Sequence, residues 1–93
     1  MATKVAVVTG AAGGLGRAIS QKLLDSGFGV VGLDIDTAGL DEAAKELGSG
    51  FVPKTTDLTD AKRVKQVFDE IAQDYGGLDA LVNNAGTCFM SDF

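Results

Sequence analysis

The sequence predicts an α/β fold in which three helices cover a doubly wound parallel sheet of four strands. Two observations lead to this prediction. Short apolar runs alternate with segments whose apolar residues recur at helical spacing, in the order strand, helix, strand, helix, strand, helix, strand. Such alternation builds a parallel sheet whose strands are joined by right-handed crossovers. The second observation is the length, because 93 residues allow one domain at most.

The first strand is expected at Val5–Val8, an apolar run with β-branched residues at three of its four positions. Continuous runs of this kind are typical of strands buried on both faces. A helix is expected at Leu15–Ser26, ended by Gly27, because apolar residues recur there at helical spacing, namely Leu15, Ala18, Ile19 and Leu23. A second apolar run, Phe28–Asp34, predicts the second strand and ends in an acid.

The second helix is predicted from apolar residues at positions i, i+3, i+4 and i+7, which are Leu40, Ala43, Ala44 and Leu47. Gly48 is expected to end it. The segment Phe51–Thr56 predicts a weaker third strand. Its Pro53 has no N–H for the ladder, which places this strand at a side of the sheet.

The third helix carries the clearest apolar stripe, formed by Val64, Val67, Phe68, Ile71, Ala72 and Tyr75. Thr59 is expected as its N-cap, and Gly76 with Gly77 as its end. The segment Leu78–Val82 then predicts the fourth strand.

The order of the elements predicts the strand order 3-2-1-4. If the first three strands step outward in one direction, the fourth lies beside the first, and the third helix crosses the opposite face from the other two. Ligands of such sheets bind at the carboxyl ends of the strands where the order reverses. Here that point lies between the glycine-rich segment after Thr9 and the turn at Asn83–Gly86, so these two segments are expected side by side.

The glycine-rich segment Thr9–Gly16 joins a predicted strand to a predicted helix. Glycines let the backbone turn sharply and let N–H groups approach a ligand that a Cβ would obstruct. The first N–H groups of a helix lack partners within it, and the helix dipole adds positive charge, so the segment predicts a pyrophosphate site. A glycine string can also be an ordinary tight turn. No Gly-Lys-Ser/Thr follows, which excludes a P-loop of the kinase or GTPase kind.

Asp34 ends the second predicted strand, 20 residues beyond Gly14. Dinucleotide-binding folds carry an acid at about this distance, which accepts hydrogen bonds from the adenosine ribose. The same carboxylate would repel a 2′-phosphate, which favours NAD over NADP. The alternative is that Asp34 or Asp36 caps the following helix.

Two further segments follow strands on the same side of the sheet. Asp57 and Leu58 end the third strand, where they could flank an adenine ring; alternatively, this segment starts the third helix, with Asp60 in its first turn. The segment Asn83–Gly86 could form a simple turn, since Asn tolerates left-handed backbone. Alternatively, its amides bond neighbouring loops, and its small residues leave room for a ribose.

These segments, in this order, resemble the short-chain dehydrogenase/reductase family, whose fold is Rossmann-type. The resemblance spans nearly the whole chain, through Thr9-Gly-x-x-x-Gly14-x-Gly16, Asp34, Asp57-Leu58, Gly76–Val82 and Asn83-Asn-Ala-Gly86. It implies an oxidoreductase that transfers hydride between NAD(H) and a small-molecule alcohol or carbonyl substrate. The cofactor-binding residues that it implies are Gly10, Gly13, Gly14 and Leu15 at the pyrophosphate, Asp34 at the adenine ribose, Asp57 and Leu58 at the adenine, and Asn84, Ala85 and Gly86 at the adjoining ribose.

Two positions bear on the choice of cofactor. Family members that use NADP often carry a basic residue just before the second motif glycine or just after the second strand. This chain has Gly13 and Ile35 there, which supports NAD. Arg17 lies past the loop and is expected as a solvated helix residue rather than a phosphate ligand.

No catalytic residue is predicted in this chain. The family's active site joins a Ser to a Tyr-x-x-x-Lys pair on a later helix, where the lysine lowers the pKa of the tyrosine because a nearby cation favours phenolate. The only tyrosine here, Tyr75, is followed four residues later by Asp79 and falls on the apolar stripe, so it is expected to pack. Residues 1–93 are therefore expected to be the N-terminal, NAD-binding part of a single domain, inactive without the catalytic half.

The composition narrows the partners. Eight basic residues against 13 acidic ones, without a Lys/Arg cluster, argue against nucleic acid and anionic membranes. The chain has no histidine and one cysteine, Cys88, so neither an internal disulfide nor a Cys/His metal site is expected. The low cysteine content also leads us to expect a cytoplasmic location. The fourth strand would leave a free apolar edge, which predicts self-association or pairing with a complementing chain.

Two other functions stay open at this point. The chain could be a non-catalytic nucleotide-binding or dimerising module. It could also be half of a SAM-binding methyltransferase, whose fold likewise places a glycine loop after the first strand and an acid after the second. The Asn-Asn-Ala-Gly element argues against the methyltransferase.

Overall fold

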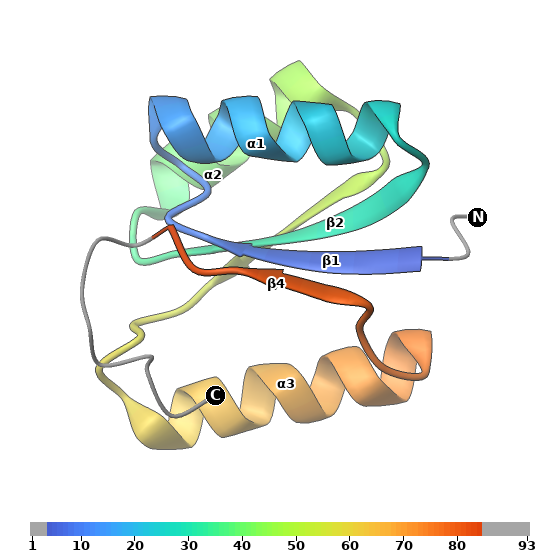
Figure 1. Cartoon of the computed structure of the whole chain (residues 1–93). Coiled ribbons are helices and arrows are strands. Elements are labelled where there is room, and N and C mark those ends of the chain that lie inside the picture. The colour runs from blue at the N-terminus through green and yellow to red at the C-terminus, as the bar shows by residue number, and fades with distance from the viewer. Residues whose placement is uncertain (1–3, 85–93) are drawn as a thin grey trace.

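Three layers make up the protein, which a computed structural model describes over residues 4–84 (Figure 1). A parallel sheet lies between α1 and α2 on one face and α3 on the other. The elements are β1 (Lys4–Thr9), α1 (Gly14–Asp25), β2 (Phe28–Asp34), α2 (Thr37–Leu47), β3 (Phe51–Thr55), α3 (Ala61–Tyr75) and β4 (Ala80–Val82). The strand order is β3-β2-β1-β4, which confirms the predicted α/β class and the order 3-2-1-4.

The strand β1 is buried on both faces, as its unbroken apolar sequence predicts. On the face toward α3, the buried core consists of Val5, Val7, Val31, Leu33, Val67 and Ile71. On the face toward α1 and α2, it consists of Val8, Ala11, Val30, Leu40, Ala43 and Phe51. Side chains of a strand alternate between its faces, so this central strand contributes to both cores.

Two helices begin at other residues than predicted, because other side chains cap their N-termini. The α2 helix begins at Thr37, a turn before the first predicted apolar residue, because the Asp36 carboxylate accepts a hydrogen bond from the Gly39 N–H at 3.0 Å. The N-cap of α3 is Asp60, which accepts hydrogen bonds from the N–H groups of Lys62 and Arg63. The prediction of Thr59 as this cap is wrong, because its hydroxyl donates to Asp57 instead.

Of the four apolar residues predicted to face the core from α1, two pack against it and two are exposed. Ile19 and Leu23 pack against the core beneath α1, together with Leu24. Leu15 is 66% exposed, and Ala18 is exposed as well. The face that α1 turns to the sheet instead buries two small residues, Gly16 and Ser20, which let the helix lie close to the strands.

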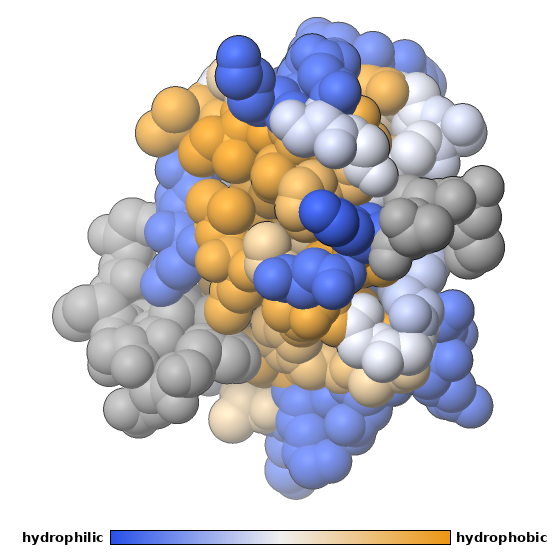
Figure 2. Space-filling view, turned by 45° about the vertical axis from the view of Figure 1, so that its right-hand side comes forward, coloured by the Kyte–Doolittle hydropathy of each residue, from blue (hydrophilic) through white to orange (hydrophobic). Residues whose placement is uncertain are grey.

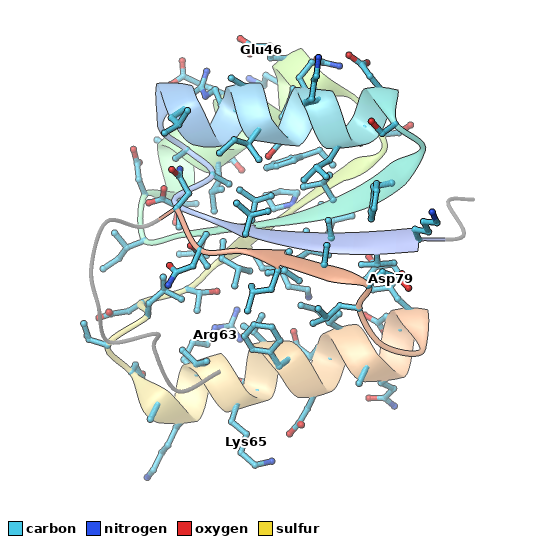
Figure 3. All side chains as sticks on the ribbon, in the orientation of Figure 1. Glu46, Arg63, Lys65 and Asp79 are labelled. Carbon is cyan, nitrogen blue, oxygen red and sulfur yellow. The ribbon has the colours of Figure 1, made fainter. Side chains whose placement is uncertain are left out.

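Asp79 fixes the start of β4 against the start of β1 (Figure 3). Its N–H donates to the Val5 carbonyl at 2.7 Å, and its carboxylate accepts from the Val5 N–H at 2.8 Å. The strand itself begins at Ala80, two residues later than predicted. At the other side of the sheet, β3 carries Pro53 at the edge of the described strands, as predicted.

One long side of β4 has no neighbouring strand among the described residues, because β4 pairs only with β1 there. All three residues of β4 are half-buried, and Leu78 before it is exposed. In Figure 1 β4 is the foremost strand, and the turned view in Figure 2 shows apolar surface across the middle of the molecule. Among residues 4–84, no helix combines the length and apolar character needed to cross a bilayer.

Candidate functional site

The glycine loop leaves β1 at Thr9 and turns back toward β2 before it enters α1. Gly10 has a φ of 66°, in the left-handed region that favours glycine. The Ala11 N–H donates to the Leu33 carbonyl at 3.1 Å, and the Gly13 N–H donates to the Gly10 carbonyl at 3.3 Å. The loop is therefore held over the carboxyl ends of β1 and β2.

The glycines of the loop serve different purposes. A Cβ on Gly16 would overlap the carbonyl oxygen of Gly10 and would lie 2.8 Å from the Ala11 Cα, so only glycine lets α1 approach the loop this closely. Among the described residues, a Cβ on Gly14 would meet nothing within 4 Å, and one on Gly13 would make an ordinary contact. Residues 4–84 thus leave the space beside Gly13 and Gly14 open to a ligand.

The N-terminus of α1 is the only one of the three described helix starts without a side-chain cap. Gly13 occupies the N-cap position, and the first turn holds no acidic residue. By contrast, Asp36 caps α2 and Asp60 caps α3. The first N–H groups of α1 and its dipole are therefore available to an anion, and Leu15 lies exposed beside them.

Asp34 lies at the end of β2 and is hydrogen-bonded to the glycine loop. Its Oδ2 accepts from the Ala12 N–H at 3.0 Å, and its Oδ1 accepts from the Asp36 N–H at 3.1 Å. Of the two acids considered for capping, only Asp36 caps α2. A carboxylate has about four acceptor positions, so the half-buried Asp34 keeps acceptors for a further donor.

The turn after β4 lies against the glycine loop, as the predicted topology requires. The Asn84 N–H donates to the Thr9 Oγ1 at 2.8 Å, and the Asn84 Nδ2 lies 3.5 Å from the Gly10 carbonyl oxygen. The Thr9 hydroxyl in turn lies 3.2 Å from the Asn83 Oδ1. Three other residues considered from the sequence, Ala85, Gly86 and Cys88, lie outside the described residues.

Asp57 and Leu58 lie at the same end of the sheet, past β3. Thr55 of β3 pairs with Asp34 of β2, and Asp57 follows Thr55 by two residues, so Asp57 lies past the end of the paired strands. The Oδ1 of Asp57 accepts from both the hydroxyl and the N–H of Thr59, at 2.6 and 2.9 Å, and these bonds hold the pKa of Asp57 below its ordinary value of 3.8. Leu58 packs against the core on the α3 face. A contact of either residue with adenine stays a prediction.

Arg17 is tied to the glycine loop, so the prediction of a solvated helix residue is wrong. Its Nε donates to the Ala12 carbonyl at 3.1 Å, and its Nη2 donates to the Gly39 carbonyl at 3.1 Å. Its side chain is 24% exposed. No sequence motif could have indicated this role, because both hydrogen-bond partners are backbone carbonyls.

The family model described as short chain dehydrogenase matches residues 4–93 of this chain. The chain belongs to the short-chain dehydrogenase family. This confirms the resemblance read from the glycine loop, Asp34 and the Asn-Asn-Ala-Gly element.

Individual members of the short-chain dehydrogenase family show the same match. The chain is 43% identical over 88 residues to a short chain dehydrogenase/reductase, dpchG, of Colletotrichum higginsianum, with 91% of this chain and 33% of that protein covered. It is 39% identical over 87 residues to a diacetyl reductase of Staphylococcus epidermidis, with 90% of this chain and 34% of that protein covered. This chain thus spans about a third of the length of these relatives.

A solved reductase has a similar arrangement of helices and strands. The crystal structure of a 3-ketoacyl-(acyl-carrier-protein) reductase from Brucella melitensis, complexed with NADH, superposes with a TM-score of 0.78 at 29% identity. The match covers 84% of this chain and 32% of the reductase. The residues present here fit such a cofactor, since the open space above Gly13 and Gly14 lies at an uncapped helix start.

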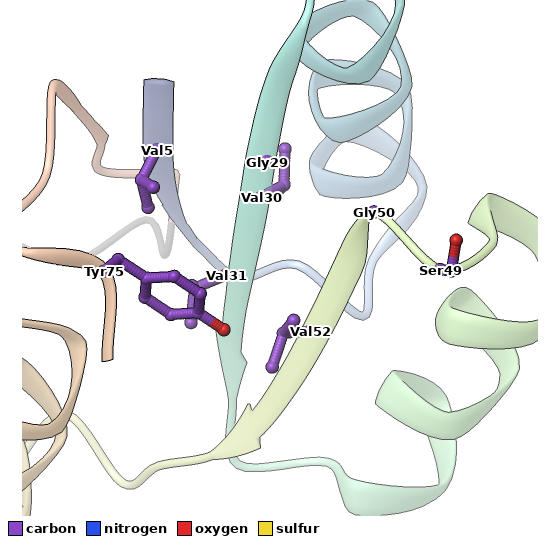
Figure 4. A pocket seen from close by; sticks show the side chains of 8 residues that line it. All are labelled: Val5, Gly29, Val30, Val31, Ser49, Gly50, Val52 and Tyr75. Carbon is purple, nitrogen blue, oxygen red and sulfur yellow. The ribbon is translucent and has the colours of Figure 1, made fainter. Parts of the chain in front are cut away.

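A cavity of about 350 Å³ lies at the opposite, amino ends of the strands (Figure 4). Tyr75 reaches into it from the end of α3, toward Val31 and Val52. The lining is mainly valine and glycine, and Tyr75 packs on the core as predicted. Within residues 4–84, no group of three or more potential metal ligands gathers there or elsewhere.

Replacing Gly16 and Gly14 by alanine tests how closely α1 packs against the glycine loop. Gly16→Ala is expected to lower the free energy of unfolding by about 1–3 kcal/mol, because the new methyl group overlaps the Gly10 carbonyl. Gly14→Ala is expected to keep the free energy of unfolding or to raise it by up to about 1 kcal/mol, because the methyl group meets no described atom and alanine favours the helix. Urea unfolding followed by circular dichroism measures both, and equal losses in the two variants would contradict the packing described for α1.

Proposed function

We propose that the chain binds NAD(H) as the cofactor-binding part of an oxidoreductase that transfers hydride between this cofactor and an alcohol or carbonyl substrate. One observation carries the proposal. The uncapped N-terminus of α1 and the Asp34 carboxylate belong to one hydrogen-bonded unit, through the Ala12 N–H. A dinucleotide needs such a pair of anchors, a set of N–H donors for its pyrophosphate and an acceptor for its ribose.

The chain's own groups would bind the cofactor in a fixed order along the sheet edge. The N–H groups of Gly14 and Leu15 would face the pyrophosphate, with Gly10 and Gly13 leaving room for it. Asp34 would accept from the adenosine ribose, with Asp57 and Leu58 near the adenine. On the other side of the loop, the second ribose would meet Asn84, Ala85 and Gly86. When bound, the nicotinamide of NAD supplies or accepts the hydride.

The environment of Asp34 supports NAD over NADP. A 2′-phosphate on the adenosine ribose would bring a negative charge against the Asp34 carboxylate. The following residue, Ile35, is 67% exposed and offers no cation in its place. Arg17, which lies nearby, already donates to two carbonyls. We therefore propose that this chain discriminates against the 2′-phosphate.

Substitution of Asp34 tests this proposal through the ratio of the NAD and NADP affinities. Asp34→Ala is expected to weaken NAD binding by about tenfold or more, because a hydrogen bond to a charged acceptor is lost. NADP binding should weaken much less, because a repulsion is lost as well. Isothermal titration calorimetry measures both affinities, with Asp41→Ala, an exposed acid on α2, as the control. An unchanged ratio in Asp34→Ala would show that this carboxylate does not face the ribose.

The chain alone is expected to catalyse nothing. Its single tyrosine is not followed by the lysine of a Tyr-x-x-x-Lys pair, and Tyr75 packs in the core at the far end of the strands. A purified preparation should therefore produce no NADH absorbance at 340 nm from NAD and simple alcohols. Turnover that follows the concentration of the pure chain would overturn this part of the proposal.

The free side of β4 supports a further, non-catalytic property, which is association with a second copy or with a complementing chain. Within the described residues β4 pairs only with β1, and an unpaired edge offers N–H and C=O groups to another strand. We expect the mass measured by light scattering to rise with protein concentration. A constant monomer mass up to millimolar concentration would contradict self-association.

Two narrower assignments accompany this proposal. Membership of the dehydrogenase family supports a nicotinamide dinucleotide rather than SAM as the ligand. Competing titrations with the two ligands decide between them, since SAM binding at the glycine loop would exclude the dinucleotide. A cytoplasmic location is proposed from the single cysteine, and fractionation of the source cells tests it.

A further inference from the structure

Asp34 and four neighbouring residues form a closed circuit of hydrogen bonds. The Ala12 N–H donates to Asp34 Oδ2, and the Asp36 N–H donates to Asp34 Oδ1. Asp36 Oδ1 accepts from the Gly39 N–H, and the Gly39 carbonyl accepts from Arg17 Nη2. Arg17 Nε closes the circuit by donating to the Ala12 carbonyl. The circuit joins the glycine loop, the end of β2 and the first turn of α2.

The charged side chain of Arg17 bonds two elements at once, because it donates to the glycine loop and to α2. Its planar guanidinium donates in two directions at once, which a lysine cannot reproduce. Its Nη1 also lies 3.8 Å from Glu46 Oε2, on the outer side of α2 (Figure 3). Both carbonyl contacts are 3.1 Å long and partly shielded from water. These three contacts fix the orientation of the guanidinium.

The contact with Ala12 determines where the carbonyl oxygen of the loop points. Arg17 holds that oxygen on the α2 side of the loop, while the N–H of the same peptide unit, on Gly13, donates to the Gly10 carbonyl. If this peptide unit turned over, its oxygen would leave the guanidinium and could face the N-terminus of α1. A carbonyl oxygen there would repel an anion, since it carries partial negative charge.

The packing beneath the circuit leaves the loop little freedom to shift as a whole. A Cβ on Gly39 would lie 2.9 Å from the Ala12 Cβ and 2.6 Å from Asp36 Oδ2, so the loop and α2 already approach closely. The loop and the first turn of α2 are therefore in tight contact, and Arg17 bonds both of them.

We propose that Arg17 is a positioning residue for dinucleotide binding, which keeps the loop N–H groups at the spacing from Asp34 that a ribose joined to a pyrophosphate requires. It acts without touching the ligand. This inference rests on the proposed function of the site. It predicts that the loss of Arg17 weakens the contribution of the pyrophosphate while the ribose contribution at Asp34 is largely kept.

The test compares ADP-ribose, which carries both groups, with adenosine, which carries the ribose alone. Arg17→Met keeps the apolar stem and removes the donors, and it is expected to lower the ratio of the two affinities by about tenfold. Arg17→Lys should recover part of this ratio, because an ammonium can donate to one of the two carbonyls. Amide chemical shifts of the ¹⁵N-labelled full chain give both affinities, and thermal unfolding gives the stability of each variant.

Arg63→Met is the matched control. Arg63 also donates through Nε and Nη2 to a backbone carbonyl, that of Thr55, but it does so from α3. The control should lose stability and keep the wild-type affinity ratio. If Arg17→Met weakened both ligands equally, or neither, the affinity ratio would stay unchanged. Arg17 would then have only a structural role, and the inference would be overturned.

If Arg17→Met does not fold, Arg17→Lys carries the test, since a wild-type ratio in this variant would also overturn the inference. Failure of the wild-type chain to bind ADP-ribose at all would instead overturn the proposed function. The two failures are thus distinguishable, because the second appears before any substitution is made.

Discussion

Parallel pairing of β1 with both of its neighbours is the constraint on which the rest of the structure depends. Because β1, β2 and β4 run in the same direction, Thr9, Asp34 and Asn84 reach the same edge of the sheet. The strand can take this central place because both of its faces are apolar and buried. The helix that follows it must start at that edge, which brings an uncapped N-terminus next to a carboxylate.

The site is built largely from backbone groups, and side chains serve to hold them. Leaving α1 without a cap costs about 1 kcal/mol relative to a capped helix. The other two helices avoid this cost through Asp36 and Asp60. The glycine loop is held instead by Asp34 and Arg17, whose charged groups bind the N–H and the C=O of Ala12. A loop held in this way, at a helix start without a side-chain cap, is suited to a pyrophosphate, because little ordering is needed on binding.

The sequence predicted the elements that leave a repeated apolar pattern. It did not predict side chains that bond backbone atoms, and it did not predict which of two adjacent residues caps a helix. The apolar runs identified all the strands found within residues 4–84, and the topology brought the glycine loop and Asn84 together. Thr59 and Asp60 are both residue types that cap helices well. The Thr59 hydroxyl donates to Asp57, which leaves Asp60 to cap α3. Leu15 fits the helical stripe by spacing, yet the loop leaves it exposed. Arg17 bonds carbonyls, which no sequence pattern marks.

The most direct measurement of the central claim is a titration of the ¹⁵N-labelled chain with NAD, followed through its amide resonances. The proposal predicts that the largest shifts occur at the carboxyl edge of the sheet, in the amides of Gly13, Gly14 and Leu15, with smaller ones near Asp34. The amides around Tyr75, at the opposite end of the strands, should not move. Shifts centred on the Tyr75 cavity, or none at saturating NAD, would contradict the account.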